Sequence, residues 1–170
     1  MMAKKGHFWI FLVNIAVFLL CIALSGTVAM DLSIKNATPL ILLPLITAFS
    51  VFYPLGTNAV VGLLTGAALD SISGNSYCFN TIFFMLAGVV IYLIANNLFN
   101  KNLWAVTVMS GIISVSYYFI YWIVFNAFGR GIGNSLIYIL EYGLPSAVYS
   151  TVFAIPLYYL YRHINKVRNK

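Results

Sequence analysis

The sequence predicts an all-α integral membrane protein, a single domain built as a bundle of six transmembrane helices. Of the 170 residues, 62% are hydrophobic and 7% are charged, and the mean hydropathy is +0.97. An ordinary soluble domain has about 25% charged residues. Six apolar runs reach the length of about 17 to 25 residues that crossing a bilayer requires. Because no polar stretch is long enough for a soluble core, we expect residues 1–170 to form one transmembrane domain.

The six expected spans lie near residues 8–29, 37–53, 55–72, 79–97, 103–128 and 137–161. Turn-forming residues separate them. The second and third spans are almost contiguous, so we expect a tight turn at Tyr53-Pro54. The first span follows two lysines, as a cleaved secretory signal would, but its apolar core is longer than the roughly 7 to 15 residues of a signal peptide. We therefore expect the first span to be retained.

The basic residues predict the orientation of the chain in the membrane. With six spans both termini lie on one side, and cytoplasmic termini put seven of the nine Lys and Arg residues in the cytoplasm, leaving Lys35 and Arg130 outside. This asymmetry accounts for the net charge of +6. A nucleic-acid partner is not expected, since such binding needs a basic surface on a folded module. The basic segment 162–170 can also attract anionic lipids of the bilayer.

A stripe of small and polar residues runs along the third expected span. Asn58, Gly62, Gly66 and Asp70 follow one another at intervals of four, and Gly74 continues the series, so they share one helix face. Glycine at this spacing lets a second backbone approach closely within a membrane. We therefore predict that these five residues form a helix-packing or partner face, with Asp70 hydrogen-bonding across the contact. The facing helix can belong to this chain or to a partner.

Asp70 carries most of the functional interest, because it is one of three acidic residues and lies in an apolar segment. Asp70 lies near the C-terminal end of the third span, where the interaction of a negative charge with the helix macrodipole is unfavourable by about 0.3 to 1 kcal/mol. This cost favours a packing or partner role over a merely solvated helix end. Glu141, at the start of the sixth span, needs only a capping role, because the dipole favours a negative charge there.

The remaining residues assemble no recognisable chemical site, so we expect no catalytic residue, no metal and no cofactor. Cys21 and Cys78 lack the spacing of a metal or redox motif, and both histidines fall at expected membrane boundaries. The serines of the fifth span have no histidine or acidic partner nearby. The glycine-rich segment 129–134 follows no strand and lacks the Lys and Ser or Thr of a phosphate loop.

The run Gly-Leu-Leu-Thr-Gly-Ala-Ala-Leu-Asp-Ser-Ile-Ser-Gly at 62–74 resembles the core motif of the MreD family of rod-shape-determining membrane proteins. Gly88 in the apolar fourth span, Leu43-Pro44 ahead of the motif, and the segment 144–160 with its short basic tail add to the likeness. It covers most of the chain, although only the motif itself is sharp. Segment 75–79 departs from the family, which often has a further glycine after the motif.

The resemblance implies a non-catalytic subunit of the bacterial elongation complex, in the cytoplasmic membrane, that helps organise lateral peptidoglycan synthesis and cell shape. The expected partner is MreC, a single-span protein with a large extracytoplasmic domain. Links to the actin-like MreB and to the wall polymerases would come through the complex. The resemblance also implies a helix arrangement similar to that of the substrate-binding components of ECF transporters.

That similarity supplies the main alternative function, a substrate-binding component of an ECF-type vitamin or small-molecule transporter. Such a component would have comparable size and charge asymmetry. It would typically carry an Ala-x-x-x-Ala pattern in its first helix, whereas Ala16 and Ala23 have a different spacing. A third class, a small channel or holin-like pore, would need polar stripes on several helices, and only segments 58–70 and 110–114 provide one.

Overall fold

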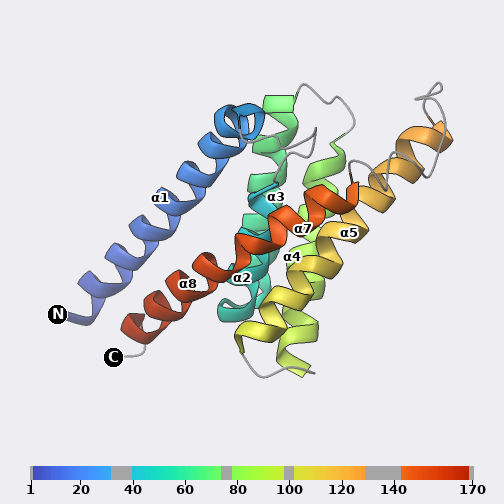
Figure 1. Ribbon diagram of the computed structural model, residues 1–170. Helices are drawn as coiled ribbons and strands as arrows, with labels where there is room; N and C mark the ends of the chain where they lie inside the picture. The colour runs from blue at the N-terminus through green and yellow to red at the C-terminus, as the bar shows by residue number, and fades with distance from the viewer. Residues whose placement is uncertain (1, 32–39, 74–77, 98–101, 129–142, 169–170) are drawn as a thin grey trace.

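The computed structural model describes residues 2–31, 40–73, 78–97, 102–128 and 143–168, with side-chain surroundings within 9–25, 40–73, 78–97, 102–124 and 143–166. This part of the chain is helical and contains no strand. Its helices are α1 (Met2–Asp31), α2 (Leu42–Phe52), α3 (Leu55–Ser73), α4 (Phe79–Asn97), α5 (Leu103–Phe128), α7 (Leu144–Val152) and α8 (Ala154–Arg168) (Figure 1). The predicted all-α class is confirmed.

Three of the described helical stretches are long and apolar enough to cross a membrane, namely Leu55–Ser73, Phe79–Asn97 and Leu103–Val124. Two further apolar stretches, Trp9–Ser25 and Leu42–Phe52, are shorter. These helices are compatible with an α-helical membrane protein. The count of six spans and the ECF-like arrangement stay predictions.

Helix α2 occupies the centre of the bundle. All 11 of its residues are buried, and it contacts every other described helix. At 1.5 Å per residue it is about 16 Å long, roughly half the apolar thickness of a bilayer. The described part of the second expected span is therefore a short helix enclosed by its neighbours.

Prolines account for the short length of α2. Pro44 lies in its first turn, where a helix tolerates a residue without an N–H group. Tyr53, with φ −116° and ψ 154°, is extended, as the residue before a proline prefers to be. Pro54 then separates α2 from α3, which begins at Leu55. The turn thus lies at Tyr53-Pro54, where the sequence predicts it.

The sixth expected span is divided within its described part. Residues 137–142, with Glu141, lie outside the described residues, and the rest forms α7 and α8, which are separated at Phe153. Pro156 offers no N–H to the carbonyl of Val152, four residues earlier, and its ring crowds that carbonyl. Helix α8 continues to Arg168, so part of the expected basic tail is helical.

Helix α1 lies along one flank of the bundle (Figure 1). It is anchored through a narrow stripe of buried side chains, Asn14, Phe18 and Cys21. Asn14 Nδ2 donates a hydrogen bond of 2.7 Å to the hydroxyl of Tyr53, and the Phe18 and Phe49 rings meet edge to face at 5.3 Å. The start of α1 and the end of α8 lie on the same side of the molecule (Figure 1).

Candidate functional site

The predicted stripe on α3 lies against α4, with which α3 forms the most extensive helix pair of the described structure. A Cβ atom added at Gly62 would stand 2.5 Å from the carbonyl oxygen of Phe84. One added at Gly66 would stand 2.5 Å from the carbonyl oxygen of Asn80. Real Cβ atoms essentially never approach other heavy atoms within 3.0 Å. Both positions therefore require glycine, because the α4 backbone occupies the space of a side chain.

The glycine contact extends to α4 itself. A Cβ at Gly88 would lie 2.9 Å from the carbonyl oxygen of Asn58. Each step of four residues along α3 thus matches a step of four back along the antiparallel α4: Asn58 faces Gly88, Gly62 faces Phe84, and Gly66 faces Asn80. The close approach brings backbone atoms of both helices into direct contact, which is the packing that small residues permit in membranes.

The carboxylate of Asp70 caps the N-terminus of α4. Its Oδ1 accepts hydrogen bonds from the backbone N of Asn80 at 3.2 Å and from Asn80 Nδ2 at 2.9 Å. Its Oδ2 accepts from the backbone N of Thr81 at 2.8 Å and from Thr81 Oγ1 at 2.6 Å. The two backbone N–H groups belong to the first turn of α4, which has no carbonyl partners within the helix. Asp70, at 7% exposure, therefore supplies the cap from the preceding helix.

The cap reverses the expected electrostatics of Asp70. On its own helix the carboxylate lies near the C-terminal end, where the macrodipole disfavours it. The antiparallel turn brings it to the N-terminal end of α4, where backbone N–H groups and the dipole favour a negative charge. A carboxylate has about four lone-pair positions. Four donors occupy them here, so little acceptor capacity remains for another ligand.

A further hydrogen bond extends the site to α5. The Tyr117 hydroxyl donates to Oδ1 of Asn80 at 2.6 Å, and both residues are buried. The Tyr117 ring packs edge to face on Phe83, with centroids 5.1 Å apart. Tyr117, Asn80 and Asp70 thus connect α5, α4 and α3 through polar contacts. Because charge-assisted and linked hydrogen bonds are strong in a low dielectric, this network fixes the three helices relative to one another.

Asn58, at the other end of the stripe, caps a third helix. Its Nδ2 donates to the carbonyl oxygens of Ser50 at 3.1 Å and Tyr53 at 3.0 Å, at the C-terminal end of α2. The terminal carbonyls of a helix lack intrahelical partners, as the first N–H groups do. The two polar ends of the stripe therefore satisfy the ends of two neighbouring helices, while the glycines between them bring the backbones together.

Sequence reasoning found Asn58, Gly62, Gly66 and Asp70, which all lie in this contact, whereas Gly74 lies outside the described residues. It missed Asn80, Thr81 and Tyr117. The sequence did contain a signal for Asn80, because a side-chain amide in the first turn of an apolar span needs a hydrogen-bond partner. Nothing in the spacing pointed to Tyr117, which is distant in the sequence.

The chemical groups outside this network are few. Among the residues that the structure describes, no three His, Cys, Asp or Glu side chains form a group that could hold a metal ion. Cys21 is buried and Cys78 is exposed, and both are free thiols. Comparison with protein-family models, with curated proteins and with solved structures gives no match.

Proposed function

We propose that this chain is a non-catalytic membrane subunit of the bacterial elongation complex, which binds an MreC-like partner and helps organise lateral peptidoglycan synthesis and cell shape. In this proposal the chain is a six-span bundle of the bacterial cytoplasmic membrane, arranged like an ECF substrate component, with cytoplasmic termini. MreB and the wall polymerases would be reached through the complex. The sequence support is the run at 62–74, which resembles the core motif of the MreD family.

The observation that carries the proposal is the use of this motif inside the molecule. Gly62 and Gly66 pack directly against the backbone of α4, and all four hydrogen bonds to Asp70 come from α4. A general acid or base must reach a proton of its substrate, and the carboxylate of Asp70 is buried and already occupied. The motif therefore supports an architectural role, in which a rigid helix hairpin presents a constant surface to a membrane partner.

Co-purification from the native bacterium tests the proposal. A tagged copy of the chain, extracted in mild detergent, should retain a single-span protein with a large extracytoplasmic domain, and depletion of the chain should turn rod-shaped cells round. Recovery of an ATPase pair with a transmembrane coupling subunit would instead identify an ECF transporter component. Normal cell shape together with no co-purifying partner would contradict the elongation role.

A matched pair of variants connects the motif to this function. Gly66→Leu drives a side chain into the α4 backbone, whereas a Cβ at Gly56, on the same helix, has no atom within 4 Å. Both substitutions make the span more apolar, so membrane insertion should persist. We expect Gly66→Leu to lose partner association and rescue of cell shape, and Gly56→Leu to keep both. Equal partner association and equal rescue of cell shape by the two variants would contradict a role of the motif in this function.

A further inference from the structure

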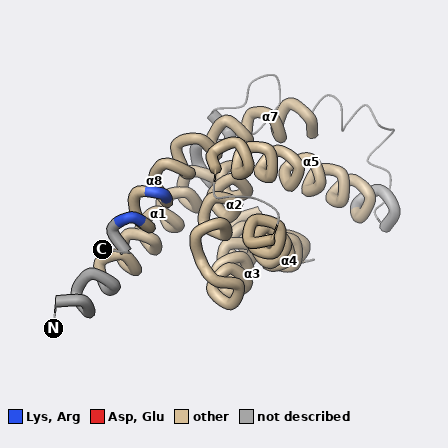
Figure 2. The backbone as a smooth tube through the Cα atoms, turned by 90° about the horizontal axis from the view of Figure 1, so that it is seen from below, with Lys and Arg blue, Asp and Glu red and all other residues tan. Residues whose placement is uncertain are grey.

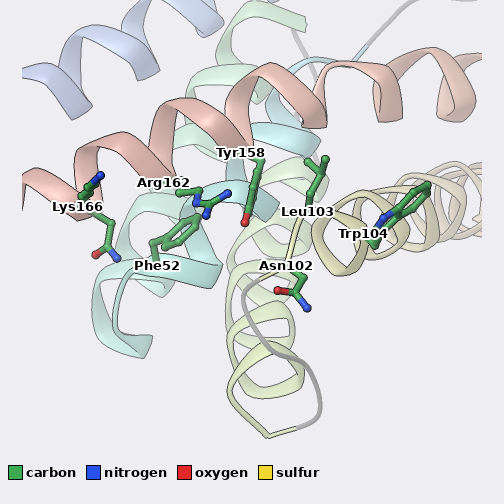
Figure 3. A pocket seen from close by; sticks show the side chains of 8 residues that line it. Phe52, Asn102, Leu103, Trp104, Tyr158, Arg162 and Lys166 are labelled. Carbon is green, nitrogen blue, oxygen red and sulfur yellow. The ribbon is translucent and has the colours of Figure 1, made fainter.

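The end of α2, the start of α5 and one face of α8 surround an open cavity of about 530 Å³ (Figure 3). This volume lies within the range of roughly 300 to 1,000 Å³ that is typical of ligand sites. The cavity is distant from the Asp70 network, because the network surrounds the first turn of α4 whereas the cavity includes Asn102, which follows the end of α4. The 19 residues of α4 separate the two by roughly 28 Å.

One wall of the cavity is cationic. Arg162 and Lys166 are four residues apart on α8 and therefore point from the same side of the helix. They are the two Lys or Arg residues whose side chains the structure describes, and Figure 2 marks both on α8. The described carboxylate, Asp70, lies well beyond the Debye length of about 8 to 10 Å. Within the described side chains the two positive charges are therefore not neutralised.

The rest of the lining is mainly apolar and aromatic. It includes Phe52 at the end of α2, Leu103 and Trp104 at the start of α5, and Tyr158, which lies on α8 four residues before Arg162 (Figure 3). The Phe52 and Tyr158 rings are buried with centroids 5.9 Å apart, whereas Trp104 is 80% exposed at the second residue of the spanning helix α5. Tryptophan at the end of a membrane helix belongs to the headgroup level, because its ring is apolar and its N–H group is polar. The cavity thus opens where the bilayer surface meets the bundle.

We propose that this cavity binds an anionic phospholipid. The headgroup phosphate lies between Arg162 and Lys166, since the planar guanidinium matches phosphate oxygens with two parallel hydrogen bonds. The glycerol and the upper acyl chains lie against Leu103 and Trp104. A free phosphate ion would use the two basic side chains alone, whereas a phospholipid uses these and the apolar lining as well. Basic pockets between membrane helices are a recognised way of holding lipid headgroups. The lipid would tie the start of α5 to α8.

Fluorescence quenching at Trp104 tests this site in the full chain. Trp9→Phe and Trp122→Phe leave Trp104 as the reporter, and the protein is reconstituted in phosphatidylcholine vesicles with increasing amounts of brominated phosphatidylglycerol or brominated phosphatidylcholine. We expect the anionic lipid to be preferred next to Trp104. Adding Arg162→Gln and Lys166→Gln should lower this preference by about tenfold to thirtyfold, the effect of two basic side chains at an anionic surface.

Lys4→Gln with Lys5→Gln is the matched control, because it removes the same charge on the same predicted side of the membrane. The control should keep the preference within about twofold. Equal loss in both double variants would mean diffuse attraction to the surface and would overturn the proposal, as would no loss in the first. Inorganic phosphate that displaces the lipid at equal concentration would overturn it in favour of a soluble anion. The single variant Arg162→Gln, with about a fivefold loss expected, serves if the double variant misfolds.

Discussion

At the scale of single residues, position 66 is decided by the backbone of another helix. A glycine inside a helix costs about 1 kcal/mol relative to alanine, so its presence needs a compensating gain. The gain here is close packing, since the carbonyl oxygen of Asn80 and the Cα atom of Thr81 would both lie 2.5 Å from any Cβ at this position. Gly56 has the same low helix propensity, but no close packing compensates for it, because that position faces open space.

Alanine at these two positions should therefore act in opposite directions. We expect Gly66→Ala to lower the free energy of unfolding by about 1 to 3 kcal/mol, the usual cost of overpacking. Gly56→Ala should leave it unchanged or raise it by up to about 1 kcal/mol through helix propensity. Unfolding in mixed micelles, followed by far-ultraviolet circular dichroism, measures both. Stabilisation of the protein by Gly66→Ala would contradict the close approach of α3 and α4.

At Asp70 the loss of unfolding free energy should depend on how many hydrogen bonds the replacement side chain can still accept. Asp70→Leu leaves the donors of Asn80 and Thr81 buried without their acceptor, which should cost about 3 kcal/mol or more of unfolding free energy. Asp70→Asn keeps one carbonyl oxygen but loses the charge at the helix end, so about 1 to 2 kcal/mol is expected.

Ser71→Ala is the control for this pair, because Ser71 is exposed and its hydroxyl bonds within α3 to the carbonyl of Ala67. Its effect should stay within about 0.5 kcal/mol. Equal losses for Asp70→Asn and Asp70→Leu would show that the charge itself is decisive. A loss for Asp70→Leu no larger than that of the control would contradict the capping role.

At the scale of elements, prolines divide apolar runs that hydropathy alone joins or extends. Pro44 lies in the first turn of the 11-residue helix α2, Pro54 follows its end, and Pro156 accounts for the break between α7 and α8. Both effects have one cause, because proline lacks the N–H group that a continuous helix needs and crowds the preceding turn. Helix α1 is packed less extensively against the bundle than these helices are. Its buried stripe is narrow, and many of its large apolar side chains are exposed.

Removing one hydroxyl should loosen α1 from the bundle. Tyr53→Phe deletes one of the two acceptors of Asn14 Nδ2 and leaves the carbonyl oxygen of Ile10, on α1 itself, as the other. The lost contact is worth about 0.5 to 1.5 kcal/mol. We expect amide hydrogen exchange across Trp9–Ser25 to accelerate by about twofold to tenfold, while α3 and α4 stay protected. Tyr159→Phe, at a side chain that is 54% exposed, is the control and should leave α1 unchanged. Faster exchange spread evenly over all helices would contradict a local effect on α1.

At the scale of the whole molecule, the α3–α4 pair separates two ends with different chemistry. One end holds the Asp70 cap and the exposed Cys78, and the other holds the cationic cavity with Arg162 and Lys166. The start of α1 and the end of α8 lie together (Figure 1). Charge asymmetry along the sequence predicts that the end with the basic residues faces the cytoplasm.

Thiol labelling of intact cells checks this orientation. In a Cys21→Ser background the native Cys78 should react with a membrane-impermeant maleimide, since it is exposed at the outer end in the predicted topology. Cysteines introduced by Asn102→Cys or Lys166→Cys in a chain with Cys78→Ser should react only after the cells are permeabilised. The reverse pattern would invert the topology.

The sequence alone determined the class of the protein and the residues that share a helix face. Composition indicated a membrane protein, and intervals of four residues joined Asn58, Gly62, Gly66 and Asp70 into one stripe, because helical periodicity is a local property. The position of the turn at Tyr53-Pro54 was predictable for the same reason. Each of these inferences depends on neighbours in the chain and on nothing distant from them.

Only the tertiary structure decided what this stripe faces. The donors that occupy Asp70 belong to the start of α4, and Asn58 reaches back to the end of α2. Tyr117 joins from α5, 37 residues beyond Asn80. The antiparallel closure of α3 on α4 also turned an unfavourable charge at one helix end into a favourable charge at another. Periodicity tells which side chains point in one direction, but the packing of whole helices selects the atoms that meet them.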